Sequence, residues 1–400
     1  MSYRSKTFKS NMITYGLVAV FYIICEAMLK SGHMSSLMQG LLVPLCYYMV
    51  LAVSLNLVVG ISGELSLGHA GFMCIGAFSS AVFASTAGKG MADVPELIIA
   101  LIIGAAFAAL FGFLIGIPVL RLRGDYLAIV TLAFGEIIKN VINAVYLGVD
   151  SHGMHVSLKD VKSLHLEDGG QVIIKGAQGI GKLPRNATFT LGIILVFLTL
   201  FIVLNLVNSR QGRAIMAARD NRIAAESVGL SVSRYKMTAF VISAALAGMA
   251  GVLYSHNLAN LQATSKNFGY NQSILILVFV VLGGIGNMRG SLIAAFLLTL
   301  LPEKLRFLSN YRMLIYAVVL IAMMIVNSSP KIVAWRKVMA EKYFKRGKAG
   351  IDEPEAAAAA EHVPTVDEAA SEITADLAAA EKEAARIDEH EADNNAEKED

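Results

Sequence analysis

Long apolar runs alternate with short polar connections along most of the chain. A helix that crosses the hydrocarbon core of a bilayer needs about 20 mainly apolar residues, so each run was compared with that length. The pattern predicts an all-α, polytopic helical membrane protein with about ten transmembrane helices. The ten segments are 12–29, 37–60, 66–87, 95–120, 125–146, 188–207, 237–254, 272–287, 291–308 and 312–327.

The fifth and eighth segments carry the weakest pattern. Segment 125–146 is apolar for only part of its length and then carries Glu136, Lys139, Asn140 and Asn143. We therefore expect a short or broken helix there. Whether this segment and 272–287 cross the whole bilayer stays open at this point.

Composition agrees with a membrane protein. Hydrophobic residues make up 56% of the chain and charged residues 16%, against about 25% in soluble domains. The mean hydropathy is +0.59. The cysteines Cys25, Cys46 and Cys74 lie in apolar runs and form no metal-ligand or disulfide pattern.

No sequence pattern for catalysis or for a bound cofactor is evident. The run 176–183 nearly matches a phosphate-binding loop, but Leu183 stands where the Mg²⁺-binding hydroxyl would be. The eight histidines are scattered, and no paired carboxylates or Ser/His/Asp pattern occur. We therefore expect a non-catalytic chain that binds no cofactor.

The positions of basic residues predict the topology. Cytoplasmic loops are enriched in Lys and Arg, which places the N-terminus 1–11, the loop 209–236 and the segment 331–350 inside. The membrane region is then 12–330, with 147–187 as an external loop. Ten crossings bring both termini to the cytoplasmic side.

The loop 209–236 has helical content of its own and holds six basic residues. Asp220 and Asn221 are good N-caps for a short helix through Ile223 to Glu226, and Gly229 is well placed to end it. A short capped helix outside the membrane is suited to contact a soluble partner. An ordinary connecting loop with a basic bias is the alternative.

Two segments outside the membrane region have distinct patterns. In the external loop, we expect the run 172–174 and the alternating residues 155–161 to form a small hairpin. The tail 351–400 holds 17 acidic and 3 basic residues, too polar for a globular core. We interpret it as a linker followed by one marginal helix, with a solvated disordered tail as the alternative.

Small residues indicate close helix packing. Gly112 with Gly116, and Gly286 with Gly290, have the GxxxG spacing that lets helix backbones approach in a membrane. One side of segment 237–254 also carries small residues, namely Ala244, Ala247, Gly248 and Gly251.

Ionisable residues are sparse at membrane depth, where each costs about 2.5–3.5 kcal/mol or more. Their scarcity argues against an ion-coupled pump and favours a transport pathway whose driving energy comes from another source. Thr131, Glu136 and Asn140 follow one another at spacings of five and four, and we expect them on one inward face as part of a translocation path. A polar packing seam without substrate contact is the alternative.

Four stretches resemble the LivM-type permease subunit of branched-chain amino acid ABC transporters. They are 62–72, 122–136, 212–254 and 281–290, and Gly-Asp-Tyr-Leu-Ala-Ile-Val-Thr-Leu, starting at Gly124, is the most specific run. The resemblance covers most of 45–300. It implies a bacterial inner-membrane permease that pairs with a second homologous permease, two ATP-binding subunits and a periplasmic substrate-binding protein.

The same resemblance implies which residues couple the chain to an ATPase. ABC permeases carry an E-A-A-x-x-x-G motif, which Ala224, Ala225 and Gly229 match, while Ile223 replaces the Glu. The expected coupling set is Arg219, Asp220, Ala224, Ala225, Glu226 and Gly229. The expected substrates are Leu, Ile and Val, with urea or short amides as the alternative. The alternative function from a different class of protein is that of a secondary transporter or of an integral subunit of an energy-transducing enzyme.

Overall fold

The computed structural model describes residues 3–32, 34–122, 124–150, 152–166, 170–305, 317, 318 and 321, with side chains described from residue 11 onwards. Nine helices correspond to the first nine predicted segments. They are α1 (Tyr3–Lys30), α2 (Ser36–Asn56), α3 (His69–Ser85), α4 (Asp93–Val119), α5 (Asp125–Ala144), α6 (Phe189–Asn208), α9 (Val232–Ser255), α11 (Tyr270–Gly283) and α12 (Met288–Lys304). Apart from 317, 318 and 321, the tenth segment lies outside the described residues, as do the predicted basic segment 331–350 and the tail 351–400.

Six of these helices are long and apolar enough to cross a membrane, judged by length and composition: α1, α4, α5, α6, α9, and α2 together with the π-helical turn η1 (Leu57–Ser62). The other three are shorter, because α3 and α12 have 17 residues and α11 has 14. The prediction of a polytopic helical membrane protein is confirmed. The number of ten spans stays a prediction.

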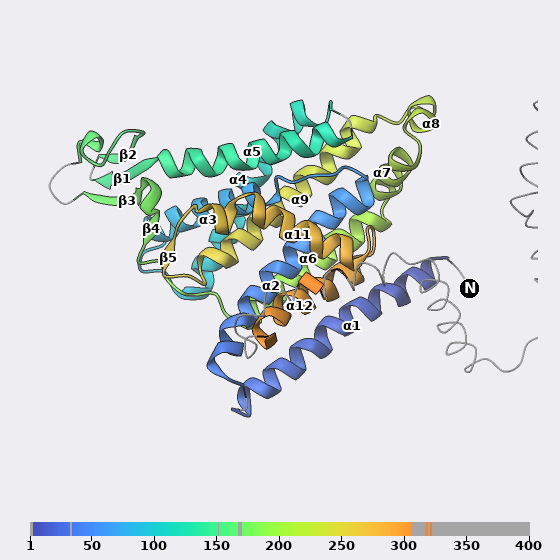
Figure 1. Ribbon diagram of the computed structural model, residues 1–400, viewed down its shortest axis with the longest axis horizontal. Helices are drawn as coiled ribbons and strands as arrows, with labels where there is room; N and C mark the ends of the chain where they lie inside the picture. The colour runs from blue at the N-terminus through green and yellow to red at the C-terminus, as the bar shows by residue number, and fades with distance from the viewer. Residues whose placement is uncertain are drawn as a thin grey trace, which may run out of the picture. The chain divides into compact units, whose positions relative to one another are not determined.

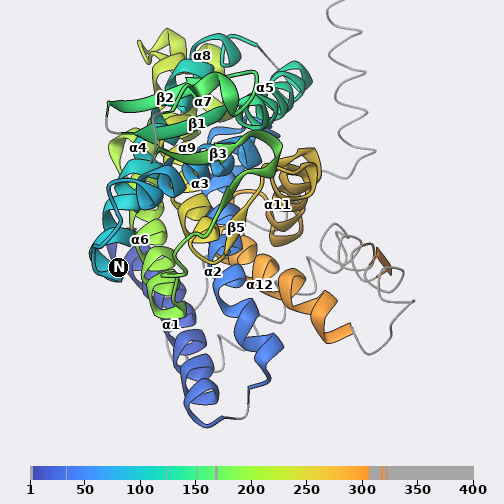
Figure 2. The ribbon, with the colours of Figure 1, turned by 90° about the vertical axis from the view of Figure 1, so that its left-hand side faces the viewer.

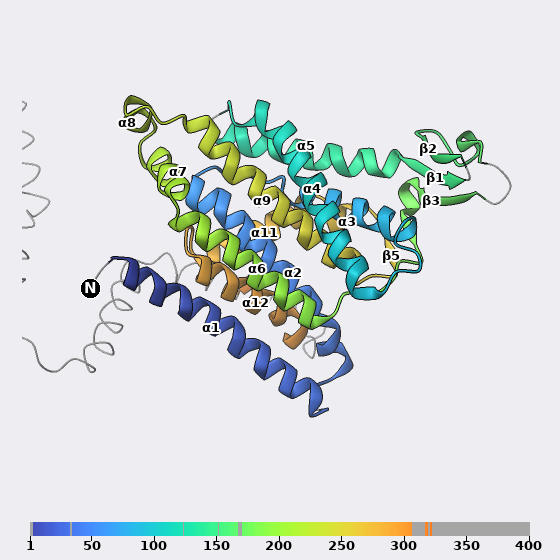
Figure 3. The same cartoon turned by 180° about the vertical axis from the view of Figure 1, so that it is seen from behind.

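The helix α2 lies at the centre of the bundle. In its most apolar stretch 89% of the residues are buried, against 17% in α1. It packs against α6, α9, α11 and α12, as Figure 3 shows. The second centre is α9, which contacts α3 and α4 over most of its length. The outer helices therefore leave apolar side chains for lipid or for partner proteins.

Small residues let α3, α4 and α9 approach closely, as predicted. A Cβ atom on Gly248 would lie 2.4 Å from the Ala108 Cβ and 2.6 Å from the Gly104 carbonyl oxygen. A Cβ on Gly112 would lie 2.6 Å from the Ala244 Cβ. The second predicted GxxxG pair also marks close contacts, since a Cβ on Gly290 in α12 would meet the Gly283 carbonyl oxygen of α11, but only Gly290 lies in a helix. Gly286 precedes α12 in a turn with φ +81°, and packs against η1.

The expectation that segment 125–146 forms a broken helix is wrong. The helix α5 is continuous over 20 residues, because its polar residues bond to a neighbouring segment and leave the helix intact. The segment also ends two residues earlier than expected, since Tyr146 begins a strand.

The external hairpin prediction is also wrong in its pairing. Strand β1 (Tyr146–Asp150) is the centre of a three-stranded antiparallel sheet, with β2 (Gly153–Ser157) on one side and β3 (Gln171–Lys175) on the other. The two runs predicted to pair with each other thus both pair with β1. Figure 2 shows this sheet beside the end of α5. The short helices η2 (Lys162–Leu164) and η3 (Gly176–Gln178) complete the region.

A second, two-stranded sheet joins β4 (Ile180–Gly181) to β5 (Asn260–Leu261), which follows α9. The run 176–183 therefore ends in a strand, and no helix follows it until Phe189. A phosphate-binding loop must lead directly into a helix N-terminus, and this run does not.

Figure 1 shows α7 (Arg210–Asp220) and α8 (Arg222–Ser227) at one end of the bundle and β1–β3 at the other. Arg121 follows the C-terminus of α4 and lies at the α7–α8 end. The opposite end of α4 lies near β4, because Glu96 in its first turn accepts a hydrogen bond from Asn186. Arg121 thus lies at the same end as the basic residues of the loop 209–236, whereas Lys159, Lys162 and Lys175 lie in the β1–β3 region. The orientation of the two ends in a membrane stays a prediction.

Candidate functional site

Two features hold the predicted site residues, and the first is the short helix pair α7–α8. The Ser209 hydroxyl caps α7 by accepting a hydrogen bond from the Gly212 amide (3.1 Å), and Asn221 caps α8 by accepting one from the Ala224 amide (3.0 Å). Asp220 is the last residue of α7, so Asn221 alone acts as the cap of α8.

The end of α8 follows from Gly229, whose φ is +84°. The Gly229 amide donates to the Glu226 carbonyl and the Leu230 amide to the Ala225 carbonyl, both at 3.0 Å. This pair of hydrogen bonds around a glycine with positive φ is a common way for a helix to end. The predicted stop at Gly229 is therefore confirmed.

One face of α8 packs on its neighbours and the other is exposed. Ala225 is buried with Ala218 and Val232, and Leu230 packs against this cluster. The exposed face carries Ile223 and Val228, which are 81% and 75% exposed. Of the expected coupling residues, Asp220, Ala224, Glu226 and Gly229 are exposed, whereas Ala225 faces inward.

Arg219 also turns toward the bundle through its guanidinium. Its Nη1 donates to the Gly60 carbonyl in η1 at 2.8 Å, and its Nε donates to Asp220 at 2.9 Å. Lys236 forms an ion pair with Glu64, two residues after η1. Arg219 thus ties α7 to η1, and Lys236 ties the first turns of α9 to the segment that follows η1. Sequence reasoning missed the exposure of Ile223 and Val228, although a large apolar residue within α8 and another directly after it, in a basic loop, were a signal.

Arg219→Ala should loosen α7, because it removes a charge-assisted hydrogen bond to η1 that is partly shielded from solvent. We expect backbone amides of α7 to exchange with deuterium about fivefold faster, which corresponds to about 1 kcal/mol. Arg222→Ala is the matched control, since Arg222 pairs only with Glu226 on the surface of α8 (2.8 Å). Equal exchange in the two variants would remove Arg219 as a tether.

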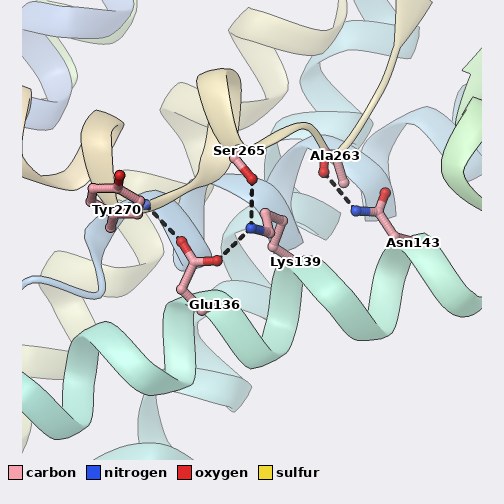
Figure 4. Close-up of polar contacts among 6 residues, drawn as sticks. All are labelled: Glu136, Lys139, Asn143, Ala263, Ser265 and Tyr270. Carbon is pink, nitrogen blue, oxygen red and sulfur yellow. Dashed lines mark hydrogen bonds and ion pairs between the residues drawn. The ribbon is translucent and has the colours of Figure 1, made fainter.

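The second feature is a polar seam between α5 and the segment that joins α9 to α11. We call the contacts of Glu136, Lys139 and Asn143 with residues 263–270 the α5 seam (Figure 4). Lys139 pairs with Glu136 and donates to the Ser265 hydroxyl (2.9 Å). Glu136 also accepts from the Tyr270 amide (2.7 Å). Asn143 adds a third contact to the seam, because its side-chain amide donates a hydrogen bond to the Ala263 carbonyl oxygen (2.8 Å).

The three predicted path residues do not share one face. Thr131 is buried, donates to the Ala128 carbonyl and accepts from the Leu67 amide (3.0 Å). Glu136 lies in the seam, whereas Asn140 is exposed. Nine residues at about 100° each leave Thr131 and Asn140 half a turn apart, which is why that part of the prediction is wrong. Lys139 and Asn143, rather than Asn140, are the residues of α5 that join Glu136 in the seam.

The N-termini of α3 and α11 meet close to this seam. The Ala70 amide in the first turn of α3 donates to the Ser273 hydroxyl in the first turn of α11 (3.2 Å). The first turn of α11 also supplies the Tyr270 amide that Glu136 accepts. Helix N-termini carry partial positive charge, so this part of the bundle favours negative groups.

Among the described residues, no group of three or more His, Cys, Asp or Glu side chains is arranged to hold a metal ion. The seam therefore offers one carboxylate, one ammonium group, hydroxyls and helix N-termini. Such groups can bind a small polar or charged solute.

Comparisons with known proteins identify the family. The family model described as branched-chain amino acid transport system / permease component matches residues 37–326. The chain is 37% identical to the high-affinity branched-chain amino acid transport system permease protein LivM of Escherichia coli (strain K12) and, equally, to LivM of Salmonella typhimurium. In both cases the match covers 70% of this chain and 66% of the relative.

A more distant relative is the nucleoside ABC transporter permease protein NupC of Lactococcus lactis, at 25% identity over 58% of this chain and 71% of that protein. No solved structure matches the chain. The family model covers well over half of the residues and includes both the α7–α8 pair and the α5 seam. The chain belongs to the family of permease components of branched-chain amino acid transport systems.

Proposed function

We propose that the chain is the membrane-spanning permease subunit of an ATP-driven importer of the branched-chain amino acids Leu, Ile and Val. The observation that carries this proposal is the identity of 37% with LivM over 70% of the chain. In this role the chain hydrolyses no ATP itself. Its partners are a second, homologous permease, two ATP-binding subunits and a substrate-binding protein.

The helix α8 supports the coupling role. It is an outlying helix with two apolar side chains, Ile223 and Val228, exposed to more than 70%. Because these two side chains lie beside Ala224 and Gly229 of the E-A-A-x-x-x-G-like run, we infer that they form the contact with an ATPase subunit. The bond from Arg219 to Gly60 then connects α7, the neighbour of α8, to η1 at the end of α2.

The orientation in the membrane follows from the basic residues at the α7–α8 end. By the positive-inside rule that end faces the cytoplasm, where ATPase subunits reside, and the β1–β3 sheet faces the periplasm of a bacterial inner membrane. This orientation puts the N-terminus of α1 inside. The C-terminus is inside as well if the chain crosses ten times.

Uptake by the assembled complex tests the proposal. The chain, a homologous permease, two ATPase subunits and a binding protein are reconstituted in liposomes and supplied with radiolabelled Leu, Ile, Val or urea. We expect uptake of the three amino acids that requires ATP hydrolysis. ATP-dependent uptake of urea alone favours the runner-up substrate class, and uptake driven by an ion gradient without ATP contradicts the importer proposal.

A further inference from the structure

The ion pair Glu136–Lys139 lies within a helix that is long and apolar enough to cross a membrane. The Lys139 side chain is only 7% exposed and that of Glu136 26%. Charged side chains within a membrane-spanning segment are expensive, and a buried ion pair is often replaced by apolar residues without loss of stability. The ion pair is therefore poorly explained by its contribution to the stability of the fold, which favours a functional role for it.

Each member of the pair has a further partner suited to hold a ligand charge. Lys139 has the Ser265 hydroxyl beside it, so its ammonium group is already turned toward the α9–α11 connection. Glu136 reaches the Tyr270 amide at the N-terminus of α11, where a carboxylate is favoured. The seam thus holds one positive and one negative group in direct contact, close to two helix N-termini.

A zwitterion carries the same two charges a few ångströms apart. An α-amino acid that enters between Glu136 and Lys139 exchanges one internal ion pair for two pairs with the ligand. Both protein charges have already lost most of their water in the closed seam, so binding adds little further desolvation of the protein. The amide of Tyr270 and the hydroxyl of Ser265 can serve the ligand carboxylate as hydrogen-bond donors.

We propose that Glu136 and Lys139 bind the two charges of a zwitterionic α-amino acid during its passage. Lys139 and the first turn of α11 take the carboxylate, and Glu136 takes the ammonium group. The Glu136–Lys139 pair in this structure is the closed state of that site. The inference rests on the proposed function and names the substrate class by its two charged ends.

Double variants that remove both charges distinguish ligand binding from a purely structural role of the ion pair, which we call a structural lock. The single variants Glu136→Gln and Lys139→Met each leave one buried charge unpaired, so both readings predict impaired uptake. The double variants Glu136→Gln/Lys139→Met and Glu136→Leu/Lys139→Leu remove both charges. Two double variants are used so that, if one fails to assemble, uptake by the other still distinguishes the two roles. Assembly is checked by size-exclusion chromatography and thermal unfolding.

For an assembled double variant we expect leucine uptake at least about tenfold below wild type, because each lost contact to a ligand charge reduces transport. A structural lock predicts recovery to wild-type uptake, and that result overturns the inference. The matched control is Glu26→Gln/Lys30→Met, which neutralises an i,i+4 ion pair on α1 (3.3 Å) and should leave uptake unchanged.

The outcomes for this inference and for the proposed function differ. Wild-type leucine uptake together with fully active double variants refutes the zwitterion site and leaves the importer proposal standing. A wild-type complex that imports urea and no amino acid refutes the proposed substrate class and, with it, the zwitterion site.

Discussion

Gly248→Ala is expected to destabilise the protein by about 3 kcal/mol, because it adds a methyl group where α4 and α9 are in close contact. The new Cβ would lie 2.4 Å from the Ala108 Cβ and 2.6 Å from the Gly104 carbonyl oxygen, and no flexible side chain there can move aside. The α4–α9 contact must open, and overpacking of this kind costs 1–3 kcal/mol and sometimes more. Thermal unfolding in detergent measures the change.

Gly16→Ala is the control for this prediction. Gly16 lies in α1, and nothing lies within 4 Å of a Cβ built there. A glycine-to-alanine change in an open helical position should be neutral or should stabilise by about 0.5–1 kcal/mol. If the two variants unfold at the same temperature, the close approach of α4 and α9 described here is incorrect.

Ile223→Asp combined with Val228→Asp is expected to abolish ATP-driven uptake, with the residual rate at least about tenfold below wild type. Both side chains are exposed, so the helices should fold and insert normally. If α8 docks on an ATPase subunit, two carboxylates in an apolar contact would be buried without partners, which costs several kcal/mol. Co-purification of the ATPase subunits and leucine uptake are both measured.

Val156→Asp controls for the introduction of an acidic group at an exposed apolar position. Val156 is 64% exposed on β2, at the opposite end of the bundle. It should leave co-purification of the ATPase subunits unaffected. Normal co-purification and uptake in the Ile223/Val228 double variant would mean that α8 is a plain connecting loop, the alternative that the basic loop left open.

The transmembrane helices were predictable because their apolar runs are continuous and their ends are polar. The cap at Asn221 and the stop at Gly229 were also predictable, since both depend on a single residue type in a local conformation. In contrast, Ala225 looked like a contact residue by its motif. Only the packing of α7 against α9 shows that it faces inward.

The errors have two physical causes. Spacing alone placed Asn140 beside Thr131, although spacings of five and four add to half a helical turn. Strand pairing is non-local: β3 is separated from β1 by two turns and β2, and nothing in residues 172–174 states which strand they join. The α5 seam likewise depends on residues 263–270, more than a hundred positions away along the chain.

The short helix α11 has a consequence for the way the protein sits in lipid. Its 14 residues span about 21 Å, whereas the hydrocarbon core is about 30 Å thick. Its ends meet protein groups: the Tyr270 amide bonds to Glu136, and beyond Gly283 the Gly286 amide bonds to Asn56 (2.8 Å). The 27-residue α4, by contrast, exceeds the core in length, and its close contact with α9 sets its tilt. The depth of α11 is therefore set by its bonds to α2 and α5, and not by a match between its own length and the bilayer.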